Sequence, residues 1–193
     1  MVFLVLTSTI AWVVANPPRI DQFSSVSVLG PDMTAASYFP GNSTTVAPNA
    51  QINWTVRVYN HMGSVQLFLL QVLLSNLTIY GPNPTNNVPS ERSLAAPLFN
   101  ATRAVQDNET WILPLQWSIV DDPSVGGTTT IQTMWINNLP LAVNPLVSAS
   151  GGMNFRIVIE LWSYDTQLRD FIFSFTSNGS VASVFDQIWF DTG

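Results

Sequence analysis

The amino-acid sequence predicts an all-β protein, an antiparallel β-sandwich of immunoglobulin-like or jelly-roll type with about eight strands, preceded by an apolar N-terminal segment. Apolar residues recur with a period of two in several segments, and turn signals of Gly, Pro and Asn separate these segments. No segment sustains the 3.6-residue period of an amphipathic helix. We divide the chain into an apolar segment with a Pro-Pro linker, residues 1–19, and an extracellular sandwich domain, residues 20–193.

Each predicted strand rests on this alternation. The clearest one is Ala50–Tyr59, whose even-numbered apolar residues share one face, so that Asn53 points to solvent. Pro114 interrupts another strand and indicates a sheet edge or a bulge. The predicted strands are Ile20–Leu29, Ala50–Tyr59, Val65–Tyr80, Trp111–Ile119, Thr128–Ile136, Phe155–Leu161, Phe171–Phe175 and Val181–Phe190.

Three connections between these strands are predicted to be irregular. Gly81–Ser90 is a long loop with three prolines, Asp121–Gly127 is a turn, and Asn137–Gly152 is a looser segment. Just before the first loop the alternation places Leu77 and Ile79 inward and Asn76 and Thr78 outward.

The composition excludes several classes of function. A net charge of −6 with no lysine disfavours a nucleic-acid partner, because a phosphate backbone is bound by clustered cations. The absence of cysteine excludes disulfides and thiol chemistry, and a single histidine leaves little for acid–base catalysis. We therefore expect no enzymatic activity and no cofactor.

Six Asn-X-Ser/Thr acceptor sites suggest a glycosylated protein exported to the cell surface. Each lies in a predicted turn or on a predicted polar strand face, where an attached glycan would stand in solvent. These predicted acceptors are Asn42, Asn53, Asn76, Asn100, Asn108 and Asn178.

The most apolar stretch, Val2–Val14, allows three interpretations: a strand inserted into a neighbouring subunit, a membrane anchor, or a strand of its own domain. It is short for a membrane helix, and no cationic residue precedes it. Seven of its residues are β-branched, which favours extended structure. In the first interpretation alternate side chains contact the next subunit, and these are Val2, Leu4, Leu6, Ile10, Trp12 and Val14.

Several stretches are similar to a known family. A Leu29–Asp32 turn (LGPD), a Tyr38–Pro40 break (YFP) and a strand ending in Asn60-His61 resemble an uncharacterised archaeal membrane-protein family with an extracellular domain. The resemblance extends over roughly residues 20–165. It implies an immunoglobulin-like extracellular domain and supplies no catalytic residues.

The remaining candidate residues favour structural roles. His61 lies in a Gly-containing turn without a catalytic partnership, and Glu160 and Asp165 face opposite sides of a strand. Asp121-Asp122 is the one candidate for calcium, although its loop lacks spaced oxygen ligands. Among the tryptophans, Trp54, Trp111 and Trp117 occupy core-facing positions, while Trp135, Trp162 and Trp189 are open to a role in subunit contact.

These observations favour a structural subunit of a cell-surface filament, in which Val2–Val14 completes a sheet of the next copy. Such head-to-tail insertion generates a homopolymer, because it does not close on itself. The alternative is a single-pass membrane anchor that presents the sandwich outside the cell, alone or beside a membrane complex; only this alternative has the membrane as a partner.

Overall fold

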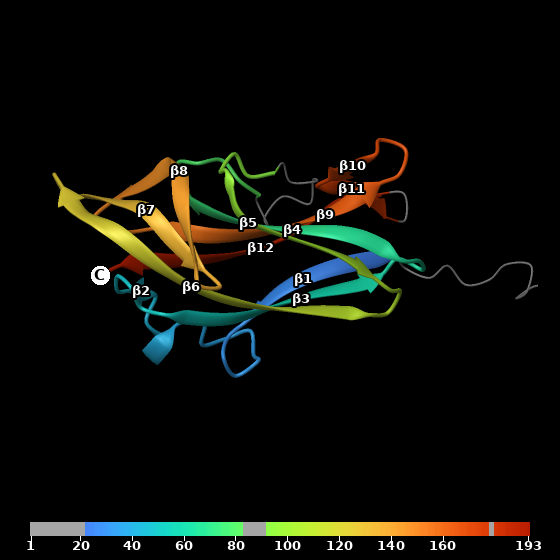
Figure 1. Ribbon diagram of the computed structural model, residues 1–193, viewed down its shortest axis with the longest axis horizontal. Helices are drawn as coiled ribbons and strands as arrows, with labels where there is room; N and C mark the ends of the chain where they lie inside the picture. Colours follow the sequence, from blue (N-terminus) through green and yellow to red (C-terminus); the bar gives the residue numbers. More distant parts are fainter. Residues whose placement is uncertain (1–21, 83–91, 178–179) are drawn as a thin grey trace, which may run out of the picture.

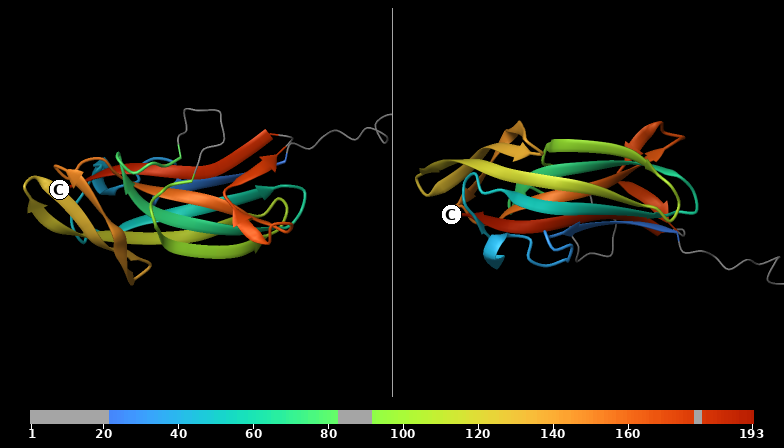
Figure 2. Two further views of the ribbon diagram at one scale, coloured as in Figure 1. Left: turned by 90° about the horizontal axis from the view of Figure 1, so that it is seen from above. Right: turned by 60° about the horizontal axis from the view of Figure 1, so that its bottom comes forward.

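The computed structural model describes residues 22–82, 92–177 and 180–193. Twelve strands and one short 3-10 turn, Pro40–Asn42, make up the regular structure of these residues. They form two sheets that pack face to face, and Figure 2 shows them from two further sides. The predicted fold class, an antiparallel β-sandwich, is confirmed. The predicted contact residues between Val2 and Val14 lie outside the described residues.

The first sheet has five antiparallel strands. Their spatial order is β1 (Phe23–Leu29), β3 (Ile52–His61), β6 (Thr110–Val125), β7 (Thr128–Ile136) and β8 (Leu139–Ser150). The prediction of a turn from Asp121 is wrong at its start, because β6 continues to Val125. The turn itself is Gly126-Gly127, where φ values of 66° and 78° favour glycine.

The second sheet has seven strands. Its main path runs through β11 (Ser174–Ser177), β12 (Ser180–Thr192), β9 (Phe155–Asp165), β4 (Gln66–Asn76) and β5 (Pro97–Val105). β10 (Asp170–Ile172) pairs with β9, and β2 (Thr45–Val46) lies parallel to the end of β12. The single predicted strand Phe171–Phe175 is therefore two strands, which pair with different neighbours.

The core fills the space between the sheets with alternate side chains of β3, β4, β6 and β9. Trp54 and Trp117 lie at its centre with ring centroids 5.0 Å apart, and both contact Phe39 edge-on. Trp117 also contacts Phe190 of the second sheet. The prediction that Trp54, Trp111 and Trp117 face the core is confirmed, because all three are buried.

The second sheet is also covered on its outer face. Leu73 of β4 and Val158 of β9 point away from the sandwich core, yet both are buried, beneath Ile79 and Ala95 of the β4–β5 connection. β9 is consequently buried on both faces along most of its length. This second layer of packing positions the polar groups described below.

The molecule is elongated, and the described chain begins and ends at opposite ends of it (Figure 1). Phe23 at the start of β1 pairs with His61, while the N–H of Gly193 donates to the carbonyl of Val46, just before β3. The ten residues of β3 separate these two points by about 33 Å. In the described part of the chain no helix has the length and apolarity to cross a membrane.

Candidate functional site

Strand β5 is an open edge of the second sheet. It pairs with β4 along its length, and among the described residues no strand pairs with its other side. Phe99 and Ala101 stand opposite Val72 and Leu70, so they face the core, and both are only partly buried there. An unpaired backbone edge beside half-covered apolar side chains is what an added β-strand requires.

Strand β8 is one edge of the first sheet, whose other edge is β1, and β8 is less suited than β5 to receive a strand. It pairs only with β7 in the part of the chain that the structure describes. Pro140 and Pro145 lie within it, and a proline offers no N–H to a neighbouring strand. Its register with β7 is also interrupted between Ile131 and Thr133. β5 is therefore the better candidate acceptor.

Four of the six predicted glycan acceptors are exposed. Asn42 lies in the 3-10 turn, Asn53 on the outer face of β3, Asn100 on the outer face of β5 and Asn108 in the β5–β6 turn. Asn178 lies outside the described residues. The exposure of Asn53 agrees with the alternation that predicted it.

The prediction that Asn76 points to solvent is wrong. Its side chain is 6% exposed, and its Nδ2 donates to the carbonyl of Ser148 at 2.7 Å. Its Oδ1 accepts hydrogen bonds from Thr78 and from the N–H of Ile79. Leu77, predicted to point inward, is 67% exposed, because the strand ends at Asn76 and the chain turns there. A glycan on Nδ2 of Asn76 would require this nitrogen to leave the carbonyl of Ser148 and reach solvent.

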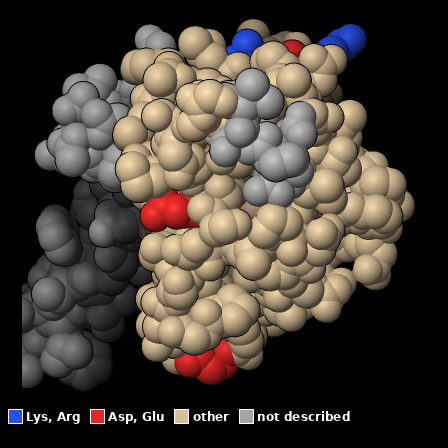
Figure 3. Space-filling view, turned by 90° about the vertical axis from the view of Figure 1, so that its left-hand side faces the viewer, with Lys and Arg blue, Asp and Glu red and all other residues tan. Residues whose placement is uncertain are grey.

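Charged groups are scarce at the surface. Figure 3 shows the end of the molecule that carries the C-terminus, where isolated carboxylates stand among uncharged residues. The single ion pair among the described residues joins Arg103 and Glu109 on the surface at 2.7 Å. Uncharged side chains therefore surround the few charged groups on this face.

Two charged side chains are buried on the outer face of β9 and hold the β4–β5 connection against the sheet. Arg156 donates to the carbonyl of Ile79 at 2.8 Å and to Oε1 of Gln187 at 2.9 Å. Glu160 accepts the N–H of Ser93 at 2.5 Å and the indole N–H of Trp162 at 3.2 Å. We call Arg156 and Glu160 the clasp, because one binds the first part of the connection and the other binds its last part.

The clasp requires a close approach of backbone to guanidinium. A β-carbon at Gly81 would lie 2.6 Å from Nη2 of Arg156, so a larger residue there would displace the side chain. The guanidinium carbon also lies 5.0 Å from the ring centroid of Trp189 on β12. Arg156 is thus enclosed by a carbonyl, an amide and an aromatic face, which compensate for its removal from water.

Burial shifts the pKa values of two carboxyl groups upward. Desolvation raises the pKa of Glu160, against the opposing effects of the hydrogen bonds from Ser93 and Trp162 and the charge of Arg92. Desolvation also raises the pKa of Asp186 on β12, although its carboxylate accepts the N–H groups of Val28 and Gln187. The bond from Val28 joins β1 of the first sheet to β12 of the second.

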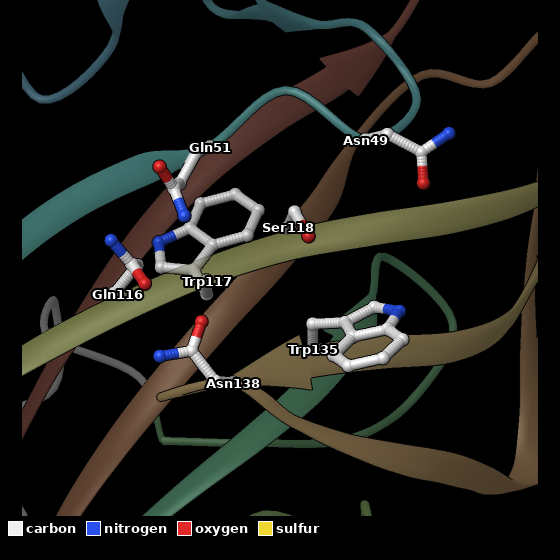
Figure 4. Close-up of a pocket in the computed structure, with 7 residues that line it drawn as sticks. All are labelled: Asn49, Gln51, Gln116, Trp117, Ser118, Trp135 and Asn138. Atoms are coloured by element: carbon white, nitrogen blue, oxygen red, sulfur yellow. The ribbon is translucent and has the colours of Figure 1, made fainter.

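A polar hollow lies on the outer face of the first sheet (Figure 4). Its volume is about 270 Å³. Gln116 and Ser118 on β6 lie along its middle, with Gln51 and Asn49 to one side and Trp135 and Asn138 to the other. Trp135 is 40% exposed, and none of the residues that line the hollow is charged. We call this site the Trp135 pocket.

The other candidate residues have structural surroundings. His61 stacks on Tyr59, and its Nδ1 lies 2.5 Å from Oδ1 of Asn108. Glu160 and Asp165 serve different purposes, since Asp165 caps the turn at Gln167 and Leu168. No group of three or more potential metal ligands occurs among the described residues. The side chains of Asp121 and Asp122 are not among those described, so the calcium prediction stays a prediction.

Comparison with known proteins gives no family assignment. No protein-family model and no curated protein matches the chain. Two solved structures are similar over most of it at a TM-score of 0.37. One is a CARDB domain from Pyrococcus furiosus in complex with di-metal ions, with 14% identity over 90% of this chain and 96% of that one. The other is a β-glucosidase from Listeria innocua in complex with glucose, with 10% identity over 89% of this chain. The matched part is 16% of the β-glucosidase, and this similarity is too low to transfer a family, a ligand or an activity.

Proposed function

We propose that the protein is a non-enzymatic, glycosylated subunit of a cell-surface filament, in which the N-terminal segment of one copy adds to strand β5 of the next. The observation that supports this most is the open β5 edge with its half-covered Phe99 and Ala101. A strand added there gains main-chain hydrogen bonds along nine residues and covers these side chains.

The shape of the domain agrees with a head-to-tail polymer. Strand β1 begins at the end of the sandwich opposite the C-terminus. Val2, Leu4, Leu6, Ile10, Trp12 and Val14 are the side chains expected to enter the neighbour. At about 1.5–3 kcal/mol for each fully buried large side chain, their burial outweighs a substantial ordering cost.

Deletion of residues 1–15 tests the proposal. We expect the truncated protein to be a monomer, whereas the full chain forms linear assemblies measurable by light scattering and electron microscopy. A peptide of residues 2–14, carrying added arginines for solubility, should bind the truncated protein and protect the β5 amides from hydrogen exchange. A peptide of scrambled order is the matched control, because it keeps the apolar composition and changes which side chains face the neighbouring sheet.

Two outcomes contradict the proposal. Full-length protein that stays monomeric in detergent with a helical N-terminus would support the single-pass membrane anchor instead. Peptide binding that protects β8 and leaves β5 unchanged would show that strand addition occurs at the other edge, and the assignment of β5 would be wrong.

A further inference from the structure

The Trp135 pocket and the predicted glycan acceptor Asn53 belong to one continuous surface. Oδ1 of Asn53 accepts a hydrogen bond from Nε2 of Gln116 at 3.0 Å, and Gln116 lines the pocket. Asn53 pairs with Gln116, and Ser118 pairs with Trp135, so all four side chains stand on the outer face of the first sheet.

The chemistry of the pocket matches a neutral saccharide. Its lining offers amide groups from Asn49, Gln51, Gln116 and Asn138 and the hydroxyl of Ser118, which can both donate to and accept from sugar hydroxyls. Trp135 adds an exposed indole against which the apolar C–H face of a pyranose ring can pack. A charged ligand would find no counter-charge among these residues.

The distance suits a glycan attached to the same chain. β3 and β7 are two strands apart, and the register places Trp135 two residues along from the position opposite Asn53. Their β-carbons are therefore separated by about 12 Å. The first few sugars of a glycan on Nδ2 of Asn53 can cover this span while its Oδ1 keeps the bond to Gln116.

We propose that the Trp135 pocket holds the first sugars of the glycan carried by Asn53. This inference rests on the glycosylation included in the proposed function, and it is independent of filament assembly. The glycan then packs along β3, β6 and β7 rather than standing free in solvent, and it stabilises the folded domain.

A cycle of two substitutions tests this proposal. The protein without residues 1–15 is secreted from a host that attaches N-glycans, with the other acceptor sites removed. Thr55→Val removes the glycan from Asn53 and keeps the asparagine side chain, and Trp135→Ala removes the indole. We expect the glycan to raise the melting temperature by about 2–4 °C when Trp135 is present. In the Trp135→Ala protein we expect the same glycan to produce less than half of that shift.

Ile112→Ala is the matched control, because Ile112 is an exposed apolar residue on the same face of β6, away from the pocket. In the Ile112→Ala variant the glycan should raise the melting temperature by the same amount as in the protein with Ile112. A second measurement is the indole N–H resonance of Trp135, which should shift when Asn53 is glycosylated. An equal glycan effect with and without Trp135 overturns the proposal, as does an Asn53 that the host leaves unmodified. Because no filament is formed in this experiment, its failure leaves the assembly proposal unaffected.

Discussion

At the scale of single residues, the same type of side chain has opposite roles in this protein. Asn53 and Asn100 are exposed on strand faces and are predicted glycan acceptors. Asn76 is buried and hydrogen-bonded through both its Nδ2 and its Oδ1. The Asn-X-Ser/Thr pattern does not distinguish the exposed asparagines from the buried one, because all three stand in it. Local alternation predicted Asn53 correctly because β3 is covered on one face only. It failed for Asn76 because Asn76 stands on the core face of β4, two residues after Leu74, whereas the prediction placed the odd-numbered residues inward.

We expect Asn76→Ala to destabilise the unglycosylated protein by about 2 kcal/mol. The substitution leaves the carbonyl of Ser148 and the N–H groups of Thr78 and Ile79 without the partner they have in the folded state. Asn100→Ala is the control, and a change within about 0.5 kcal/mol is expected there because its side chain is exposed. Urea denaturation measures both free energies, and equal effects would contradict the role of Asn76.

At the scale of elements, most strands could be predicted from the sequence, and three could not: the two-residue β2, β5 and β8. β5 and β8 were missed, since as edge strands they alternate poorly between buried and exposed residues. The prediction of a looser segment over Asn137–Gly152 is wrong, because β8 occupies most of it. Pro114, in contrast, was predicted to mark an edge or a bulge. It marks a local edge, because it lies beyond the end of β7, where Asn137 instead donates to its carbonyl.

The clasp could not be predicted either, because it depends on contacts between residues far apart in the chain. Arg156 and Ile79 are 77 residues apart, and Glu160 and Ser93 are 67 apart. Alternation on this strand places its odd-numbered apolar residues toward the core, and Arg156 and Glu160 on the other face, where solvent is expected. They are buried because the β4–β5 connection folds back over β4 and β9.

We expect Arg156→Ala to destabilise the protein by about 2–4 kcal/mol, because it removes charge-assisted hydrogen bonds to Ile79 and Gln187 and the contact with Trp189. It should also accelerate hydrogen exchange at Ser93 and Leu94, on the connection that the clasp holds. Arg103→Ala, which breaks the surface ion pair with Glu109, should cost at most about 1 kcal/mol. Unchanged exchange at Ser93 in the Arg156→Ala variant would refute the proposed restraint.

At the scale of the whole molecule, the low charge of the chain determines how its stability responds to acid. Few carboxylates are paired with cations: among the described residues Arg103–Glu109 is the one ion pair. The carboxyl groups of Glu160 and Asp186 instead favour the folded state as the pH falls. Their pKa values are raised in the folded state from ordinary values of 4.5 for Glu160 and 3.8 for Asp186.

The folded protein therefore binds more protons than the unfolded chain in the pH interval just above these ordinary values. The free energy of unfolding therefore rises as the pH falls through this interval, because the folded state binds protons at Glu160 and Asp186 more strongly than the unfolded chain does. We expect the melting temperature to be higher near pH 4 than at pH 7, as measured by circular dichroism at constant ionic strength. Glu160→Gln should reduce this increase, since the amide has no charge to desolvate, while Glu109→Gln on the surface should leave the increase in place. A melting temperature that falls steadily from pH 7 to pH 4 in the unmodified sequence would show that carboxylate pairing outweighs the burial of Glu160 and Asp186.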